Sequence, residues 1–211
     1  GLYNNTLTED EVAIEDALSG EMLRAHPEVT WKYLLQIESA CRGARHNAAH
    51  EALARLQDRY ERFTVLTQNI DGFHRSAGTR DLIEIHGCVQ ELECSGCRAH
   101  WQVPDYSALS LPPRCEQCRG PVRPRVVLFG EMLPEDALER LYAVLDEGVD
   151  LVMSIGTTSV FPYIAGPVVQ AAQAGIPTVE VNPDESEVSP LVRYRLRERA
   201  AVALPRLVAS L

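Results

Sequence analysis

The chain has 211 residues, of which 45% are hydrophobic and 24% are charged. This composition excludes a fibrous or globally disordered protein, and the length suits one large domain or a domain with a small satellite. No apolar run approaches the roughly 18–20 residues that a membrane span needs. With 20 basic and 30 acidic residues, the net charge of −10 argues against a nucleic-acid-binding protein. We therefore expect a soluble, cytoplasmic protein that binds neither a membrane nor nucleic acid directly.

Residues 9–60 have a helical pattern. Thr8 and Glu11 have the spacing of a capping box at the start of a first helix. A second helix is expected from Pro27 onward, because apolar residues recur at helical spacing. These residues are Val29, Tyr33, Ile37 and Cys41, the last of which we interpret as a small core residue. A third helix is expected over residues 47–60.

After residue 60 the helical periodicity gives way to short apolar runs with little polar alternation. Such runs are typical of strands buried on both faces of a parallel sheet. They are residues 63–66, 82–85, 126–129, 151–155 and 178–181. Helical segments at 135–147 and 165–174 separate the later strands, so we expect an α/β protein with a Rossmann-like parallel sheet. We also expect an edge strand at 194–197 and a last helix that Pro205 opens in its first turn.

Four of the six cysteines form two C-x2-C pairs with seventeen residues between them. They are Cys94, Cys97, Cys115 and Cys118. This spacing is typical of a four-thiolate zinc site, whose closed tetrahedron leaves no position for water. The alternatives are two disulfides or a thioredoxin-like redox pair. The doubled motif and the absence of a secretion signal favour one structural zinc ion. Cys88 is interpreted as a buried, inert thiol.

The segment around these cysteines, residues 88–122, interrupts the alternation of strands and helices. It is rich in Pro, Cys, Gly and Arg and poor in large apolar residues. We expect a small inserted zinc-binding domain that buries little core and depends on its metal. Residues 1–87 and 123–211 then form a discontinuous Rossmann-like domain, with a helical part at about 9–60.

Polar and glycine residues follow four of the predicted strands. In a doubly wound sheet, ligands bind beyond the carboxyl ends of the strands. The four segments are residues 67–72, 86–87, 156–159 and 182–184. Taken singly, Asn69 and Asp71 are explained as turn residues and His86 as a structural histidine. Their coincidence at four strand ends favours one binding site, with Gly156 near phosphate and Asn182 or Asp184 near ribose hydroxyls.

Several of these motifs occur in one order along the chain. They are Thr67-Gln68-Asn69-Ile70-Asp71, His86-Gly87, the two C-x2-C pairs, Phe129-Gly130-Glu131, and the strand ends at Gly156-Thr157 and Asn182. In this order they resemble the Sir2 family of NAD-dependent protein deacylases, most of all its bacterial members. The resemblance covers nearly the whole chain, and the combination is specific although no single part is.

The resemblance implies a role for each matching residue. His86 is implied to be the catalytic base. The implied NAD-binding residues are Gln68, Asn69, Ile70 and Asp71 around nicotinamide and its ribose, Gly156, Thr157 and Thr158 in the phosphate and ribose loop, and Asn182, Pro183, Asp184 and Ala200 around adenosine. The implied peptide-binding segment, which pairs with substrate as an added strand, contains Val127, Phe129, Gly130 and Glu131.

The implied activity is the removal of an acyl group from a protein lysine, with transfer to ADP-ribose and release of nicotinamide. NAD is the implied cofactor, and acyl-lysine proteins or peptides are the implied substrates. His86, with a reference pKa of about 6.5, would accept a proton near neutral pH, whereas the zinc takes no part. The alternative on the same site is ADP-ribosyl transfer or NAD hydrolysis. A non-enzymatic zinc-ribbon adaptor is a further alternative, which the net charge disfavours.

The chain departs from the family pattern in three places. Family members begin with a strand and a Gly-Ala-Gly-x-Ser loop, whereas this sequence starts with Gly1-Leu2-Tyr3, so we expect a fragment or a natural truncation that binds NAD poorly by itself. Leu34 and Ile37 stand where succinyl-preferring members carry a Tyr-x-x-Arg pair, which predicts a preference for neutral acyl groups. The loop after Gly156 is one residue short, which leaves Thr158 and Ser159 as alternatives.

Overall fold

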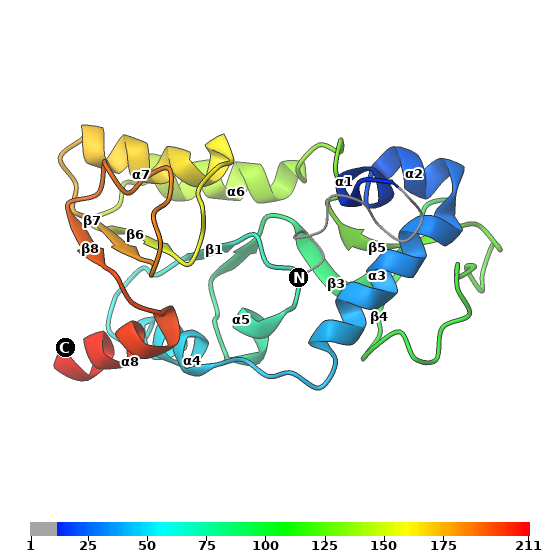
Figure 1. Ribbon diagram of the computed structural model, residues 1–211, viewed down its shortest axis with the longest axis horizontal. Helices are drawn as coiled ribbons and strands as arrows, with labels where there is room; N and C mark the ends of the chain where they lie inside the picture. Colours follow the sequence, from blue (N-terminus) through cyan, green and yellow to red (C-terminus); the bar gives the residue numbers. More distant parts are fainter. Residues whose placement is uncertain (1–11) are drawn as a thin grey trace. The chain divides into compact units, whose positions relative to one another are not determined.

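The computed structural model describes residues 12–211, so the predicted capping box at Thr8 and Glu11 lies outside the described residues. Figure 1 labels the helices and strands of the chain. They divide into two compact units, each with its own buried core. In unit 1 the described residues are 12–45, 66–72 and 84–138, and unit 2 comprises residues 46–65, 73–83 and 139–211. No helix within residues 12–211 is long and apolar enough to cross a membrane.

Unit 1 combines three helices with an antiparallel sheet. The helices are α1 (Ile14–Ala17), α2 (Gly20–Ala25) and α3 (Pro27–Cys41). The sheet has the order β4-β3-β5, from β3 (Gly87–Cys94), β4 (His100–Gln102) and β5 (Val122–Val126). The second predicted helix is confirmed as α3, which begins at Pro27 because proline fits the first helical turn, where no N–H partner is lost.

The core of unit 1 joins the cysteine-rich segment to the N-terminal helices. Val89, Leu92 and Val122 are buried in the same cluster as Trp31, whose indole Nε1 donates to the carbonyl of Val122 at 3.3 Å. The Trp31 ring also packs against Tyr106, with ring centroids 5.4 Å apart. The expectation that residues 88–122 bury little core is therefore wrong, because one face of their sheet is covered by the helices.

Unit 2 is built around a parallel sheet with the order β6-β7-β8. Its elements are α4 (Ala48–Leu56), α5 (Phe73–Ser76), α6 (Glu135–Asp146, which begins in unit 1), β6 (Val152–Ile155), α7 (Pro162–Gln173), β7 (Thr178–Val181), β8 (Tyr194–Leu196) and α8 (Ala200–Ser210). Three of the predicted strands thus form a parallel sheet, and within residues 12–211 the edge strand β8 pairs with β7 alone.

Helices cover both faces of this sheet. The buried side chains of α4 and α8 share one core cluster with Val181 of β7, and α7 packs against β6 and β7. Figure 1 shows the strands between α7 on one side and α4 with α8 on the other. The layering follows from the sequence, because strands buried on both faces need a helix on each.

A separate two-stranded sheet, β1 (Val65–Thr67) and β2 (Leu82–Glu84), lies where the chain passes between the units. The discontinuous Rossmann-like domain and its insert at 88–122 remain a prediction.

Two predicted elements are wrong. The strand expected at 126–129 is not formed: Val126 ends β5, Phe129 makes an isolated parallel bridge with Ser19, and the chain turns there, with a hydrogen bond from the Glu131 amide to the Leu128 carbonyl at 3.1 Å. An apolar run buries side chains in such a turn as well as in a strand. Pro205 lies inside α8 and does not open it. The helix starts about one turn earlier, at Ala200. Burial of Ala203, Leu204 and Val208 along the helix compensates for the hydrogen bond that the proline cannot donate.

Two smaller expectations also change. The third helix ends at Leu56 and not at residue 60, because the Gln57 side chain leaves the helix to bond the backbone of Gly78 and Arg80, both at 2.8 Å. Cys41 is half-buried and is not part of the core, whereas Cys88 is buried as predicted.

Candidate functional site

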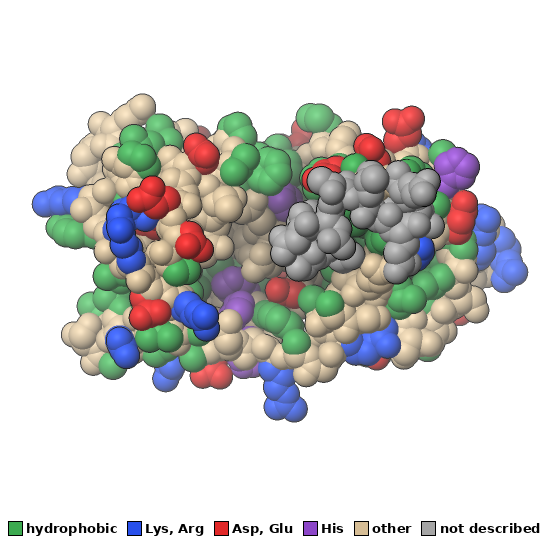
Figure 2. Space-filling view, viewed as in Figure 1, with side chains coloured by type: hydrophobic (Ala, Val, Ile, Leu, Met, Phe, Trp, Pro, Cys, Tyr) green, Lys and Arg blue, Asp and Glu red, His purple; other side chains and the backbone are tan. Residues whose placement is uncertain are grey.

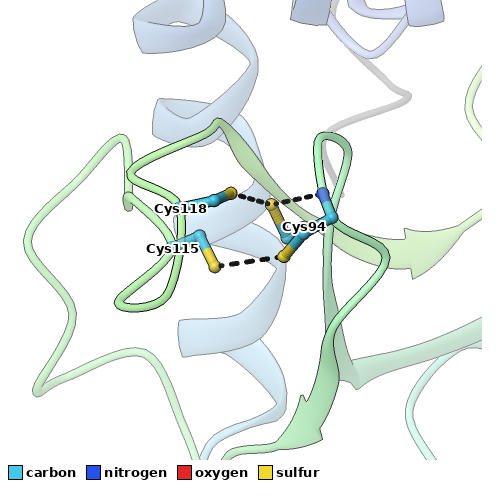
Figure 3. A group of neighbouring side chains, drawn as sticks. Cys94, Cys115 and Cys118 are labelled. Carbon is cyan, nitrogen blue, oxygen red and sulfur yellow. Dashed lines mark hydrogen bonds between the residues drawn. The ribbon is translucent and has the colours of Figure 1, made fainter.

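The four predicted metal ligands converge in unit 1. Every pair of their sulfur atoms lies within 4.8 Å, and Figure 3 shows the side chains of Cys94, Cys115 and Cys118 turned toward one another. The Sγ atoms of Cys94 and Cys118 are 3.4 Å apart, and those of Cys97 and Cys115 are 3.7 Å apart. A tetrahedron with Zn–S bonds of about 2.3 Å has sulfur–sulfur edges of about 3.8 Å. The arrangement therefore fits one metal ion, and none of the four cysteines is in a disulfide.

Backbone amides stabilise the thiolate of Cys94, whereas at Cys118 the amide of Gly120 is outweighed by the neighbouring thiols, which raise the pKa to about 12. The amides of Cys97 and Gly96 donate to the Cys94 sulfur at 3.5 and 3.3 Å, and the Gly120 amide donates to the Cys118 sulfur at 3.4 Å. The hydrogen bond from Cys97, assisted by that from Gly96, lowers the pKa of Cys94 to about 6. Four thiolates in a closed tetrahedron are typical of structural zinc.

The predicted base, His86, lies between β2 and β3 in unit 1. Its Nδ1 is 3.1 Å from the carbonyl oxygen of Gln68. A carbonyl oxygen only accepts, so Nδ1 carries the proton and Nε2 carries the lone pair of the neutral ring. Burial lowers the pKa of His86, against the opposing effect of the bond to Gln68. The imidazole is therefore neutral at physiological pH and oriented to accept a proton at Nε2.

Backbone hydrogen bonds bring the predicted nicotinamide segment next to His86. The Ile85 amide donates to the Thr67 carbonyl at 3.1 Å, and the Val89 amide donates to the Ile70 carbonyl at 2.8 Å. The Thr67 hydroxyl in turn accepts from the Asn69 amide at 3.1 Å. Within unit 1 the structure thus brings Gln68, Asn69, Ile70 and Asp71 together with the predicted base, and the Asn69 side chain is exposed.

Gly87 explains why the chain can turn directly after the base. Its φ is +77°, and a Cβ there would lie 1.9 Å from the Arg125 carbonyl oxygen. Only glycine allows β3 and β5 to approach this closely. The approach also lets the Val127 amide donate to the His86 carbonyl at 3.0 Å. The first residue of the predicted peptide-binding segment is therefore hydrogen-bonded to the predicted base.

In the rest of that segment, the Glu131 side chain is hydrogen-bonded to other residues of the chain. Its two carboxylate oxygens accept from the Arg123 guanidinium at 2.6 and 2.7 Å, and one of them accepts from the Leu128 amide at 3.0 Å. Burial raises the pKa of Glu131, but the bonds from Arg123 and Leu128 outweigh it and lower the pKa overall. The carboxylate thus shapes the turn that presents Phe129 and Gly130, both of which are exposed.

In unit 2 the predicted nucleotide loops follow the neighbouring strands β6 and β7. Three hydrogen bonds join these loops. The Gly156 amide donates to the Val181 carbonyl, the Asn182 side-chain amide donates to the Thr157 carbonyl, and the Glu187 amide donates to the Thr158 carbonyl, each at 3.0 Å. Parallel strands end at the same edge, which is why segments about 25 residues apart meet here.

The structure also bears on the choice between Thr158 and Ser159. Ser159 is 1% exposed, with its hydroxyl 3.4 Å from that of Ser154, whereas Thr158 is exposed. The buried hydroxyl is directed into the unit, so the exposure favours Thr158 as the ligand-binding residue.

The remaining predicted adenosine residues also lie in unit 2. Pro183 and Asp184 are exposed, and the Asp184 amide donates to the Asn182 side chain at 3.2 Å. Ala200 is the first residue of α8, where a helix has amides without intrahelical partners. The sequence reasoning missed Glu180, a buried carboxylate in β7. A charged residue between two valines in residues 178–181 was the available signal.

Comparisons with known proteins agree with these motifs. A sequence model described as "Sir2 family" matches residues 1–162. A Pseudomonas aeruginosa protein named NAD-dependent protein deacylase 2 is 48% identical over 214 residues, which cover 100% of this chain and 83% of that protein. An Archaeoglobus fulgidus protein named NAD-dependent protein deacylase 1 is 32% identical over 92% of this chain and 79% of that protein.

Solved structures of Sir2 homologues share the fold. A Sir2 homolog–NAD complex has a TM-score of 0.86 at 31% identity, over 94% of this chain and 77% of that one. A structure of Sir2 bound to acetylated peptide has a TM-score of 0.82 at 28% identity, over 92% of this chain and 83% of that one. The predicted fold class is confirmed, and the chain belongs to the Sir2 family.

Proposed function

We propose that the chain is an NAD-dependent protein-lysine deacylase, which transfers the acyl group to ADP-ribose and releases nicotinamide. The observation that carries the proposal is the hydrogen bond from His86 Nδ1 to the Gln68 carbonyl, because it leaves the lone pair of a neutral histidine on Nε2. The names of the relatives support it, since those compared are NAD-dependent protein deacylases.

In this reaction His86 accepts a proton from a ribose hydroxyl at Nε2. Its lowered pKa keeps the ring in the neutral form that this step requires. When bound, NAD supplies a leaving group, since the positively charged nicotinamide departs as a neutral molecule. Asn69 and Asp71, on the segment that is hydrogen-bonded to the His86 region, provide amide and carboxylate groups for nicotinamide, and Gln68 provides an amide for the ribose.

The loops of unit 2 suit the phosphates and the adenosine of NAD. A Cβ at Gly156 would meet no atom within 4 Å, so the space beside this backbone is open. Thr158, two residues after Gly156, and Asp184, on the loop after β7, are exposed and offer a hydroxyl and a carboxylate. Asn182 orients the loops through its bond to the Thr157 carbonyl. His86 is thus the proposed proton acceptor, and the loops after β6 and β7 carry the proposed nucleotide contacts.

The acyl-lysine peptide is proposed to pair, as an added strand, with the segment that contains Val127, Phe129, Gly130 and Glu131. The Phe129 amide and carbonyl already bond Leu18 and Gly20 at 3.0 and 3.1 Å, so the peptide would use the other backbone groups of the segment. Gly130 has a φ of +77° with no atom within 4 Å of a Cβ built on it, so an approaching backbone meets no side chain there. Glu131 and Arg123 hold the turn in shape. A cytoplasmic location, the absence of direct nucleic-acid or membrane binding, and one structural zinc ion complete the proposal.

Product analysis tests the reaction. The full-length protein is incubated with NAD and acetyl-, propionyl-, butyryl-, crotonyl- and succinyl-lysine peptides, and all products are identified by mass. Formation of O-acyl-ADP-ribose, nicotinamide and the peptide with an unmodified lysine supports the proposal. A peptide carrying ADP-ribose, or free ADP-ribose without acyl transfer, would instead support the transferase or hydrolase alternative. His100→Ala, an exposed histidine of β4, is the matched control for His86→Ala.

The same panel tests acyl preference. Leu34 is 1% exposed in the core of unit 1 and Ile37 is half-buried, and neither side chain can pair with a carboxylate. We expect neutral acyl groups to be removed faster than succinyl. Desuccinylation as fast as deacetylation would contradict this part of the proposal.

A further inference from the structure

Unit 2 contains a buried carboxylate, that of Glu180, which the proposed mechanism does not use. Glu180 lies in the middle of β7 and is 1% exposed. Its neighbours Val179 and Val181 pack with the cluster formed by α4 and α8. Side chains alternate along a strand, so Glu180 projects from the opposite face. A charge buried this deeply needs hydrogen-bonding partners.

The partners of Glu180 come from two places. Arg195 of β8, which stands opposite Glu180 in the strand register, donates from Nε at 2.7 Å. Ser189 donates its hydroxyl at 2.7 and 3.0 Å to the two oxygens, and Ser186 donates to the same carboxylate. Both serines belong to the segment between β7 and β8, which we call the 182–189 loop. The carboxylate thus ties this loop to the edge strand.

The same groups order the backbone of the 182–189 loop. The Ser189 hydroxyl accepts from the Ser186 amide at 2.8 Å, which closes the turn between them. Arg195 reaches the loop a second time, from its guanidinium to the Asp184 carbonyl at 3.4 Å. Arg195, which also contacts Glu185 at 3.3 Å, thus links Glu180 to the backbone of Asp184.

The loop in turn contacts the segment after β6. Glu187, between the two serines, donates its amide to the Thr158 carbonyl at 3.0 Å. Asn182, at the start of the loop, donates to the Thr157 carbonyl at 3.0 Å. The turn that Glu180 fixes is thus hydrogen-bonded directly to the proposed phosphate and ribose loop.

We infer that Glu180 is a positioning residue for NAD, acting through Ser186, Ser189 and Arg195 to hold Asp184 and residues 157–158 in their binding geometry. This inference rests on the proposed function. The buried carboxylate does not contact the nucleotide; it sets the shape of the two loops that do.

The test compares Glu180→Ala, Glu180→Gln and Ser189→Ala with the wild type in the full-length protein. Affinity for ADP-ribose is measured by calorimetry, and the KM values for NAD and for an acetyl-lysine peptide are measured separately. We expect Glu180→Ala to weaken ADP-ribose binding and to raise the KM for NAD by about tenfold or more, because small misplacements of binding groups are costly. The peptide KM should change by less than about twofold, since the loss is confined to positioning of the nucleotide.

Glu180→Gln should restore part of this affinity. The glutamine has nearly the same shape, and its oxygen can still accept from Arg195 while its amide turns toward a serine oxygen. Should Glu180→Ala fail to fold, Glu180→Gln and Ser189→Ala carry the test alone. Hydrogen exchange without nucleotide gives a second readout, in which both variants should expose the amides of the 182–189 loop faster than the wild type.

Asp81→Asn is the matched control. Asp81 also accepts from an arginine in unit 2, Arg140, but it lies beside β2 and not in a nucleotide loop. This variant should lower the melting temperature without changing ADP-ribose affinity. If Glu180→Gln and Ser189→Ala lose stability as Asp81→Asn does and bind ADP-ribose like the wild type, the inference is overturned. If the wild type itself binds no ADP-ribose, the proposed function fails and this inference fails with it.

Discussion

The two units stabilise their irregular segments in different ways. In unit 1, four thiolates on two loops converge on one metal position, and the ligands are separated by at most 24 residues. In unit 2, a buried carboxylate on a strand gathers hydroxyls from a loop and a guanidinium from the next strand. A metal centre needs only its ligands to meet. The carboxylate network requires the register of β7 and β8 to be correct first.

The two units also differ in the burial of their ion pairs. Arg123 and Glu131 of unit 1 are 20% and 18% exposed, whereas Arg62 and Glu147 of unit 2 are 56% and 65% exposed. Both pairs join an arginine to a glutamate, but only Glu131 accepts two bonds from its arginine and one from a backbone amide. Burial and these extra bonds should separate the contributions of the two pairs to the free energy of unfolding.

Removing the metal should have the largest effect. Cys94 and Cys115 belong to the core around Trp31, and binding of a structural zinc stabilises small sites by about 10 kcal/mol or more. A chelator, or Cys94→Ser, should unfold the sheet of β3 and β5 and change the fluorescence of the buried Trp31. Cys41→Ser is the control, since its thiol is outside the cluster.

Hydrogen exchange of the same samples sharpens the comparison. If the units have independent cores, the amides of β6 and β7 should stay protected after the metal is removed. Equal loss of protection in both sheets would show that the two cores unfold as one.

His86→Ala should come next, with turnover reduced by about 10²- to 10⁴-fold because the proton acceptor is lost. Binding of ADP-ribose by unit 2 should be unchanged. In the wild type, the acid limb of kcat/KM should lie below about pH 6.5, since burial lowers the pKa of His86. Substantial turnover by the alanine variant would exclude His86 as the base.

Glu131→Gln should destabilise the protein by about 2–3 kcal/mol at pH 7, because it leaves the Arg123 guanidinium partly buried without its charge partner. The folded-state pKa of Glu131 is lowered, so its stabilising effect is present above the unfolded value of about 4.3 and is lost as the pH falls through the folded value. Denaturant titrations at pH 7 and pH 3 should show the difference shrink. A constant difference would assign the effect to packing.

Arg62→Gln should have the smallest effect. Its bond to Glu147 is 3.0 Å long, but both side chains are solvated. We expect the free energy of unfolding to change by less than about 0.5 kcal/mol in the same titrations. A loss equal to that of Glu131→Gln would mean that burial does not separate the two pairs.

Much of the candidate site could be predicted from the sequence, because its signals are local. The zinc ligands occur as two short motifs, and residues 67–71 and His86 are each adjacent to a predicted strand. Strand β7 was predicted with the bounds it has, since Thr178–Val181 is a β-rich run between loops. Periodicity failed at residues 126–129 and at Pro205, where a turn closed by a side chain and the packing of α8 override the local pattern.

The sequence by itself determined the family motifs, the four thiolates and the alternation of strands and helices, because each depends on residues close together in the chain. Only the tertiary structure showed that His86 donates to Gln68, that Glu131 is held by Arg123, and that Glu180 orders the 182–189 loop. These contacts depend on strand register and on which face a side chain occupies. Both are set by the packing of segments that are distant in the sequence.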